Sequence, residues 1–281
     1  MEQALLIVWR ESVEALLVIG ILYAWLRHQP EHTRAMRHLW AGVGLGLLLA
    51  GLLGTLMVLA GGWINGPAGE WFQTALSLLA AGLILQMLHW MAHNAWQLRR
   101  QLEQRAASAL QGRRLGSLTL LVTLAVAREG SETAIFLYGI GGTANPVPLA
   151  LGAGLGLLLG LLCVALLQAG GRLIGWRQFF LASEVWLVLL GGALLMSAVD
   201  RASGQWMAWE LPEHLYRLLG EPVWDSSALL DDGSRPGALL AGLSGYRAMP
   251  SAVHLGLLGL YWLLAWFLIR PARPPRLSPL P

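Results

Sequence analysis

The sequence predicts an all-α membrane protein with seven transmembrane helices, arranged as two inverted three-helix repeats followed by a seventh helix. Of its 281 residues, 56% are hydrophobic and only 12% are charged, a composition typical of a chain that crosses a membrane several times. Seven apolar stretches each approach the roughly 20 residues that span a bilayer. The charged pattern Arg-Glu-x-x-Glu occurs in the first stretch and again in the fourth.

The elements follow from these apolar stretches in chain order. The first is expected to be a retained helix and not a secretion signal, because Arg10 interrupts it and no basic segment precedes it. Cys163 is the only cysteine, which excludes a disulfide or a thiolate cluster within one chain. The seven expected spans cover residues 3–26, 38–62, 70–96, 116–140, 147–170, 179–200 and 251–270.

The whole chain is expected to form a single transmembrane domain, residues 1–281. Its parts are a first repeat at about 1–100, a second at about 115–200, an external loop at about 201–250, the seventh helix at 251–270 and a basic tail at 271–281. In the external loop, Trp206, Trp209 and Trp224 are candidates for docking at the membrane interface.

The arginines predict the orientation of the chain. The connections after the first, third and fifth spans, together with the tail, hold 13 arginines, whereas the opposite side holds four and most of the loop acids. The positive-inside rule therefore predicts an external N-terminus and a cytoplasmic C-terminus. We interpret the arginine clusters as topology signals and not as nucleic-acid contacts.

The repeated motif predicts an inverted repeat. Arg10 and Arg128 are 118 residues apart, each in the first helix of a three-helix group. Three spans are an odd number, so the second copy must cross in the opposite direction, and such repeats place paired sites near the membrane midplane. Small residues recur every four positions in the second and fifth spans, from Gly42 to Gly54 and from Gly152 to Gly160, which predicts close helix packing.

Helical spacing determines what each motif can do. Glu11 and Glu14 are three residues apart and therefore share one helix face, while Arg10 is four residues from Glu14. The second motif repeats this with Arg128, Glu129 and Glu132. If both faces meet, four carboxylates and two guanidiniums leave a formal charge of −2, suited to a hard cation. Without a cation, like charges favour retained protons. The alternative is that each Arg simply neutralises its own Glu partners.

These residues also resemble those of a known family. Two R-E-x-x-E helices in a seven-span chain look like the high-affinity iron permeases, the oxidase-dependent iron transporter family of bacteria and fungi. The resemblance extends over essentially the whole chain. It includes residues 127–132, the linker 101–114, Trp224-Asp225, residues 242–247 and Pro250-Ser251. Two positions depart from the family pattern: Ser12 stands where the family prefers Gly, and Gln73 follows Glu70 where a second acid is frequent.

The resemblance implies iron uptake across the bacterial cytoplasmic membrane, usually as Fe(III) produced by a partner oxidase, or as Fe(II) coupled to oxidation. The formal charge of the site, +1 with Fe(III) and 0 with Fe(II), does not choose between the two ions. Its implied ligands here are Glu11, Glu14, Glu129 and Glu132, with Arg10 and Arg128 balancing charge. Iron would be the cargo, with no permanently bound cofactor. A periplasmic oxidase or iron-delivery protein would be the partner, while the oligomeric state stays open.

Five further residues are accessory candidates. His89 and His93 share one face of the third span, a spacing that can hold a metal, although interfacial polar residues explain them as well. Glu70 marks a possible external relay, and Glu184 is an acid inside the sixth span that could equally reach the membrane edge. Asp225 would attract cations through its field, or be an ordinary solvated acid.

Three alternative functions remain open from the residues. A transporter of Mn(II) or protons would need the same carboxylates, because oxygen ligands do not by themselves discriminate these ions. A membrane-embedded carboxylate enzyme is disfavoured, since the chain has no H-E-x-x-H, no G-x-S-x-G and no cysteine nucleophile. A scaffold for a periplasmic partner would tolerate replacement of the motif glutamates.

Overall fold

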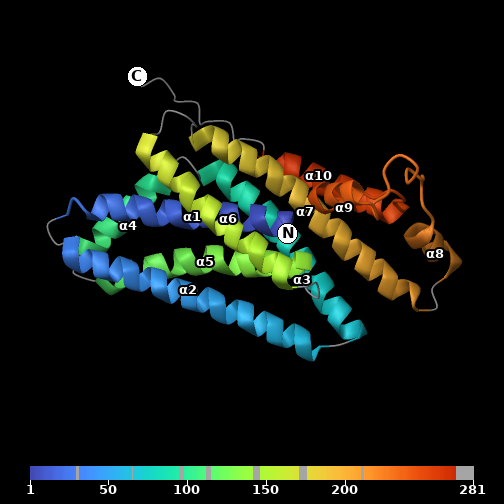
Figure 1. The fold of residues 1–281 in the computed structure, drawn as a ribbon, viewed down its shortest axis with the longest axis horizontal. Helices are drawn as coiled ribbons and strands as arrows, with labels where there is room; N and C mark the ends of the chain where they lie inside the picture. The colour runs from blue at the N-terminus through green and yellow to red at the C-terminus, as the bar shows by residue number, and fades with distance from the viewer. Residues whose placement is uncertain are drawn as a thin grey trace, which may run out of the picture.

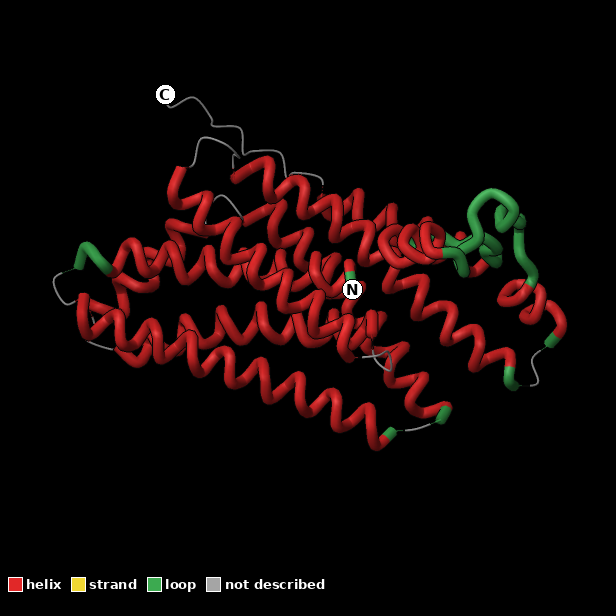
Figure 2. Tube along the Cα trace, in the orientation of Figure 1, coloured by secondary structure: helices red, strands yellow, loops and turns green. Residues whose placement is uncertain are grey.

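The computed structural model describes residues 1–29, 32–64, 66–94, 98–111, 115–141, 146–170, 176–209 and 212–269. Over these ranges the chain is helical and forms no β-strand beyond one isolated bridge between Pro222 and Ser251 (Figures 1 and 2). The predicted basic tail and several counted arginines, including Arg113 and Arg172, lie outside the described residues. The helices are α1 (Glu2–Leu26), α2 (His32–Trp63), α3 (Pro67–Asn94), α4 (Leu98–Gln111), α5 (Leu115–Gly141), α6 (Pro146–Gly170), α7 (Trp176–Met207), α8 (Glu213–Gly220), α9 (Arg235–Ser244) and α10 (Ala252–Ile269).

The expected spans coincide with seven of these helices, although several ends differ. α2 begins six residues before the expected start, and α7 continues seven residues past the expected end. Both helices extend beyond the apolar segment because backbone hydrogen bonding does not stop where the hydrocarbon ends. Within the described residues, five helices are long and apolar enough to cross a membrane: α2, α3, α6, α7 and α10. α1 and α5 have comparable length but each contains three charged motif residues.

The two halves of the chain pack against each other through two equivalent helix crossings, α2 with α5 and α6 with α1. In one crossing, Gly46 of α2 lies against Val126 of α5. In the other, Gly156 of α6 lies against Val8 of α1. The two contacts involve equivalent positions of the two repeats. Gly156 lies 110 residues after Gly46, and Val126 lies 118 residues after Val8, the same separation as between Arg10 and Arg128. These reciprocal contacts are what two packed copies of one repeat would make.

The repeated motifs, Arg-Glu-Ser-Val-Glu and Arg-Glu-Gly-Ser-Glu, lie inside these crossings and differ at two positions, of which the first faces the neighbouring helix. Ser12 of the first motif faces Gly160, where an added methyl carbon would lie 2.8 Å from the Ser12 Cβ. At the equivalent place Gly130 faces Ala50, so the larger residue is on the opposite helix. Gly160 on α6 therefore makes room for Ser12, which stands where the family prefers Gly. The two helices of each crossing can still approach closely.

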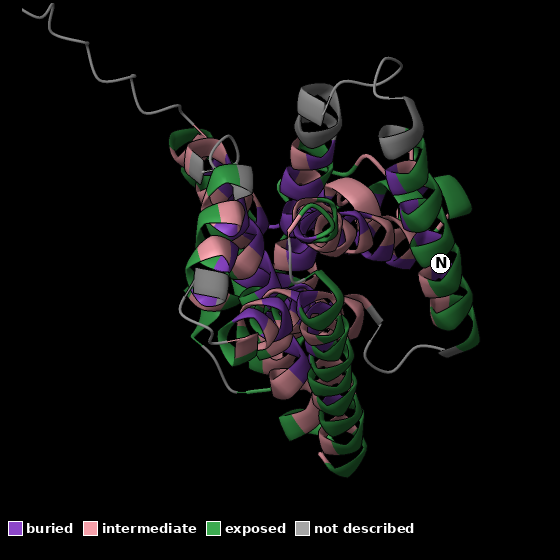
Figure 3. Ribbon diagram, turned by 90° about the vertical axis from the view of Figure 1, so that its left-hand side faces the viewer, coloured by how far each residue is buried: buried purple, intermediate pink, exposed green. Residues whose placement is uncertain are grey.

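Buried residues gather where the helices face one another, and exposed residues lie around the outside (Figure 3). One core cluster joins α3, α7 and α10 and includes Ile84, Leu194 and Tyr261. A second joins the end of α1 with α4 and the beginning of α5, including Leu26, Ala106 and Leu118. Much of the exposed surface of α2, α6 and α10 is leucine, as expected of helices that face lipid.

The predicted long loop is folded. Two short helices, α8 and α9, interrupt it. Ser234 caps the N-terminus of α9, and its hydroxyl accepts a hydrogen bond from the Gly237 N–H. Tryptophans of this region also pack internally, since the Trp206 ring lies 5.7 Å from that of Trp71 on α3. Sequence reasoning placed Trp206 at the membrane interface only, because its ring partner is more than one hundred residues away.

A polar cluster fastens this segment to the end of α7. Asp200 accepts hydrogen bonds from Arg247 Nη2 at 2.5 Å and Nε at 2.7 Å, and its other oxygen lies 2.7 Å from His254 Nε2. The His254 Nδ1 atom is in turn 2.7 Å from the Ser251 hydroxyl at the start of α10. Because these contacts join α7, the segment after α9 and α10, they fix the position of the folded loop.

Candidate metal site

Acidic side chains from α1 and α5 converge inside the bundle. Glu11 and Glu14 of α1 and Glu129 of α5 each offer one carboxylate oxygen, and these three oxygens lie within 4.8 Å of one another. The two helices run in opposite directions, since the end of α1 packs beside the beginning of α5 (Figure 1). The structure therefore brings together three of the four predicted ligands.

The fourth predicted ligand, Glu132, is buried beside this group. It lies close enough to Glu14 and Glu11 to interact electrostatically with both. Its side chain is held by Arg128, whose Nε donates to Glu132 Oε1 at 2.9 Å. Glu132 therefore borders the site while it is paired with the arginine of its own motif.

Arg10 pairs with both glutamates of the first motif. Its Nη1 lies 2.6 Å from Glu11 Oε1, and its Nη2 lies 2.5 Å from Glu14 Oε1. Only 4% of its side chain is exposed. Its Nη2 also contacts the sulfur of Met91 on α3 at 3.4 Å. A guanidinium can hold both carboxylates in this way because its donors are arranged as a planar fork.

Arg128 occupies a different environment from Arg10. Its side chain is 42% exposed, and its guanidinium carbon lies 5.4 Å from the centre of the Trp90 ring on α3. This places the cation over an aromatic face, a favourable cation–π geometry. The two motifs, identical in pattern, are therefore not equivalent in the folded chain: one arginine is sealed inside and the other lies at the edge of the site.

Several carboxylate oxygens of the site lack a hydrogen-bond donor. One oxygen each of Glu11, Glu129 and Glu132 is buried without a hydrogen-bond partner. Leaving such an acceptor buried and unpaired costs roughly 1–3 kcal/mol or more. A bound cation would satisfy these oxygens, and hard oxygen ligands suit iron as well as other hard metal ions. The donor set thus fits the cation site expected from the sequence.

The accessory candidates lie outside the group of three carboxylates. His89 and His93 stack with ring centres 4.4 Å apart, and His93 Nδ1 is 2.8 Å from the His89 carbonyl oxygen of the same helix. Glu70 is half-buried in the first turn of α3. Asp225 is exposed, and hydrogen bonds from Ser227 hold the pKa of its carboxyl below the ordinary value. Glu184 lies within electrostatic range of Arg10.

Sequence reasoning missed Met91 and Trp90, which contact the two motif arginines. Neither residue carries a recognisable signal, because both lie in an apolar helix and their role depends on how α3 packs against α1 and α5. The buried position of Gln73 was also not anticipated. Only the periodicity of α3, with Met87 and Met91 on its buried face, could have indicated that these sulfur atoms point inward.

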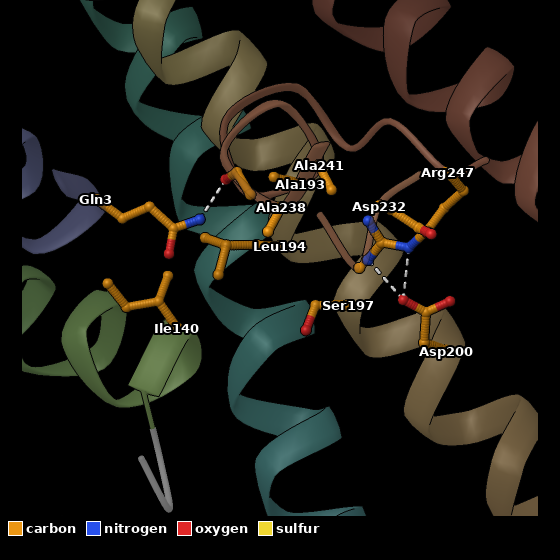
Figure 4. A pocket seen from close by; sticks show the side chains of 12 residues that line it. Gln3, Ile140, Ala193, Leu194, Ser197, Asp200, Asp232, Ala238, Ala241 and Arg247 are labelled. Atoms are coloured by element: carbon orange, nitrogen blue, oxygen red, sulfur yellow. Dashed lines mark hydrogen bonds and ion pairs between the residues drawn. The ribbon is translucent and has the colours of Figure 1, made fainter. Parts of the chain in front are cut away.

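A cavity of about 410 Å³ lies between α7 and residues 232–247, the segment that includes α9, and one residue each of α1 and α5 reaches it (Figure 4). Gln3, eight residues before Glu11 on α1, and Ile140, eight residues after Glu132 on α5, both line it. Eight residues correspond to about 12 Å of helix. The Gln3 amide donates to the Gly242 carbonyl of α9, so α9 closes over the outer side of this cavity (Figure 4). Its polar lining includes Asp200, Asp232 and Arg247.

If iron passes this site, as the family resemblance implies, Arg10→Lys is expected to lower iron uptake about tenfold. An ammonium cannot replace the fork that holds Glu11 and Glu14, and a charge-assisted hydrogen bond is worth about 1.5–3 kcal/mol. Arg128→Lys should cost less, since Arg128 is partly exposed. Initial rates of radioactive iron accumulation in cells, normalised to membrane abundance, provide the measurement. Equal uptake by wild type and Arg10→Lys would show that Arg10 does not organise the site.

Long apolar helices packed around mutually facing carboxylates define a multi-pass membrane protein with a buried acidic site. Comparison with known proteins then identifies the group. The chain belongs to the iron permease FTR1 family, whose family model matches residues 1–271. This confirms the resemblance seen in the motifs and is consistent with a location in the bacterial inner membrane.

The relatives include ferrous iron permeases named EfeU. Those of Escherichia coli O6:H1 (strain CFT073) and Shigella sonnei (strain Ss046) are each 30% identical over 283 aligned positions, covering 96% of this chain and 95% of the relative. That of Yersinia pestis is 26% identical and covers 96% and 93%, respectively. No solved structure matches the chain.

Proposed function

We propose that the chain moves iron into the cell through the carboxylate site, with Glu11, Glu14 and Glu129 as ligands and Glu132 completing the site when its pairing with Arg128 loosens. The observation that carries this proposal is the convergence of three carboxylates from oppositely directed helices within 4.8 Å. The unpaired buried oxygens support it, because they call for a cation. Arg10 and Arg128 keep the empty site from accumulating excess negative charge.

Fe(II) is the ion we propose at the site. The relatives are named ferrous iron permeases, and the formal charge of −2 from four glutamates and two arginines is neutralised by a divalent ion. An Fe(III) ion would leave a buried excess charge of +1, which is costly in a low-dielectric interior. An oxidase that delivers Fe(III), the partner implied by the family resemblance, is the alternative that experiment must separate from this proposal.

We further propose seven membrane spans, with α1 and α5 as the two that carry the site and with the N-terminus outside. α4, in the basic connection, lies at one end of the molecule, and α8 and α9, in the acidic segment, lie at the other (Figure 1). This arrangement supports the positive-inside orientation. In this orientation the cavity beside Gln3 is the external vestibule above the iron site.

Uptake into proteoliposomes tests both the ion and its oxidation state. Purified protein should accumulate radioactive iron when a reductant keeps it as Fe(II), and it should accumulate much less chelated Fe(III). A molar excess of Mn(II) should leave most of the Fe(II) uptake intact. A double variant, Glu11→Gln with Glu129→Gln, serves as the control for leakage.

The outcomes separate the alternatives. Faster transport of Fe(III) than of Fe(II) would favour the oxidase-coupled route. Complete competition by Mn(II) would indicate a general divalent cation transporter. Uptake that is unchanged in the double variant would rule out the carboxylate site as the pathway.

A further inference from the structure

The amphipathic helix α4 docks across the ends of α1 and α5. Its apolar face, Leu102, Ala106 and Ala109, is buried in the cluster that contains Leu26 and Leu118. α4 is only 14 residues long and has a polar opposite face, so it is too short to span a bilayer and suited to lie along its surface. One flank of α4 is therefore held beside the first turns of α5.

A groove of about 490 Å³ lies between α4 and α5 on the outside of the bundle. One part of it is polar, with Arg105 and Ser108 from α4 and Ser117 from α5. The other part is apolar and follows α5 toward the centre of the membrane through Leu120, Leu121 and Leu124. Leu120 and Leu124 are 57% and 60% exposed, so this apolar surface is available to a ligand.

The polar end of the groove has the chemistry of an anion site. Arg105 is exposed and forms no ion pair with any residue in the described part of the chain. The Ser117 hydroxyl likewise has no hydrogen bond to another described residue, whereas Ser108 already donates to the Gln104 carbonyl at 3.0 Å. A guanidinium beside a free hydroxyl donor matches the oxygens of a phosphate group.

We propose that this groove binds an anionic phospholipid, with the headgroup phosphate on Arg105 and Ser117 and an acyl chain along Leu120, Leu121 and Leu124. The charge and the direction of the groove select this ligand. A soluble phosphate would leave the leucines uncovered, and a zwitterionic lipid would offer Arg105 no net negative charge. Basic pockets at the ends of membrane helices bind acidic lipid headgroups for the same reason.

Lipid-dependent stabilisation of the purified full-length protein tests the proposal. Thermal unfolding, followed by tryptophan fluorescence in detergent, is measured with added phosphatidylglycerol or phosphatidylcholine. Native mass spectrometry counts the retained lipids. The test variant is Arg105→Gln, and the matched control is Arg100→Gln, which removes an exposed arginine of the same helix outside the groove.

We expect phosphatidylglycerol to raise the unfolding temperature of the wild type more than phosphatidylcholine does. Arg105→Gln should lose most of this difference and bind phosphatidylglycerol about tenfold more weakly, as the loss of one charge-assisted contact implies. Arg100→Gln should behave like the wild type. Both variants replace exposed side chains, so both should fold.

Three results would overturn the proposal. Equal stabilisation by the two lipids would show that charge does not select the ligand. Equal losses in the two variants would show diffuse attraction of lipid to a basic helix. Full competition by inorganic phosphate would show an anion site that makes no use of the apolar groove.

Discussion

Glu129→Gln is expected to reduce iron uptake by at least about tenfold, equivalent to about 1.4 kcal/mol or more. Glutamine preserves the shape of the side chain but removes a negative charge and a ligand oxygen from the group formed with Glu11 and Glu14. Radioactive iron accumulation in cells lacking other iron importers, normalised to the amount of protein in the membrane, measures the effect. Glu11→Gln should behave in the same way.

Abundance and a surface variant provide the controls for this experiment. Both site variants should reach the membrane at near wild-type levels, because glutamine keeps the side-chain volume and relieves repulsion among the carboxylates, and Arg10 keeps Glu14 as an ion-pair partner when Glu11 is replaced. Glu213→Gln, on the exposed helix α8, should transport normally. Wild-type uptake by Glu129→Gln would contradict the proposed pathway, whereas loss of the protein from the membrane would call for Glu129→Asp as a charge-preserving comparison.

Gly156→Ala is expected to destabilise the protein by about 1–3 kcal/mol, the usual cost of overpacking. The added methyl group would overlap the Leu5 carbonyl oxygen and lie 2.9 Å from the Trp9 nitrogen. Both contacts are to the backbone of α1, so relief requires α1 to move, and α1 carries the first motif. Unfolding temperature and iron uptake should therefore fall together.

Gly154 on the same helix is the matched control. A methyl group there meets no atom within 4 Å, so Gly154→Ala should keep uptake and raise stability by about 0.5–1 kcal/mol through helix propensity. The other crossing offers the same pair, with Gly46→Ala expected to destabilise and Gly44→Ala not. Similar behaviour of Gly154→Ala and Gly156→Ala would refute the close approach of α1 and α6.

Much of the fold could be predicted because the membrane restricts the choices. Apolar stretches of spanning length coincide with α2, α3, α6, α7 and α10, and the same criterion of apolar length predicted α1 and α5 although each contains charged motif residues. The folded form of residues 213–250 could not be predicted. Its short helices are held by contacts between distant residues, such as Asp200 with Arg247 and His254, which no local pattern reveals.

The convergence of the motif carboxylates was predicted from the sequence, while the asymmetry of their surroundings was not. Spacing along each helix placed Glu11 and Glu14 on one face, and the inverted repeat implied that Glu129 would meet them. Spacing alone could not show that Arg10 is buried and that Arg128 rests on Trp90, since this depends on α3. The two motifs have the same sequence pattern, but the residues around Arg10 and Arg128 differ, and so does the burial of these two side chains.

The pairing of Ser12 with Gly160 and of Gly130 with Ala50 means that the two halves have become complementary surfaces. A chain built from two copies of the first half would bring serine against alanine at both crossings, which would force the helices apart. Two copies of the second half would set glycine against glycine and leave voids. If the permease arose by duplication, its halves have since diverged as partners, and neither can be replaced by a copy of the other.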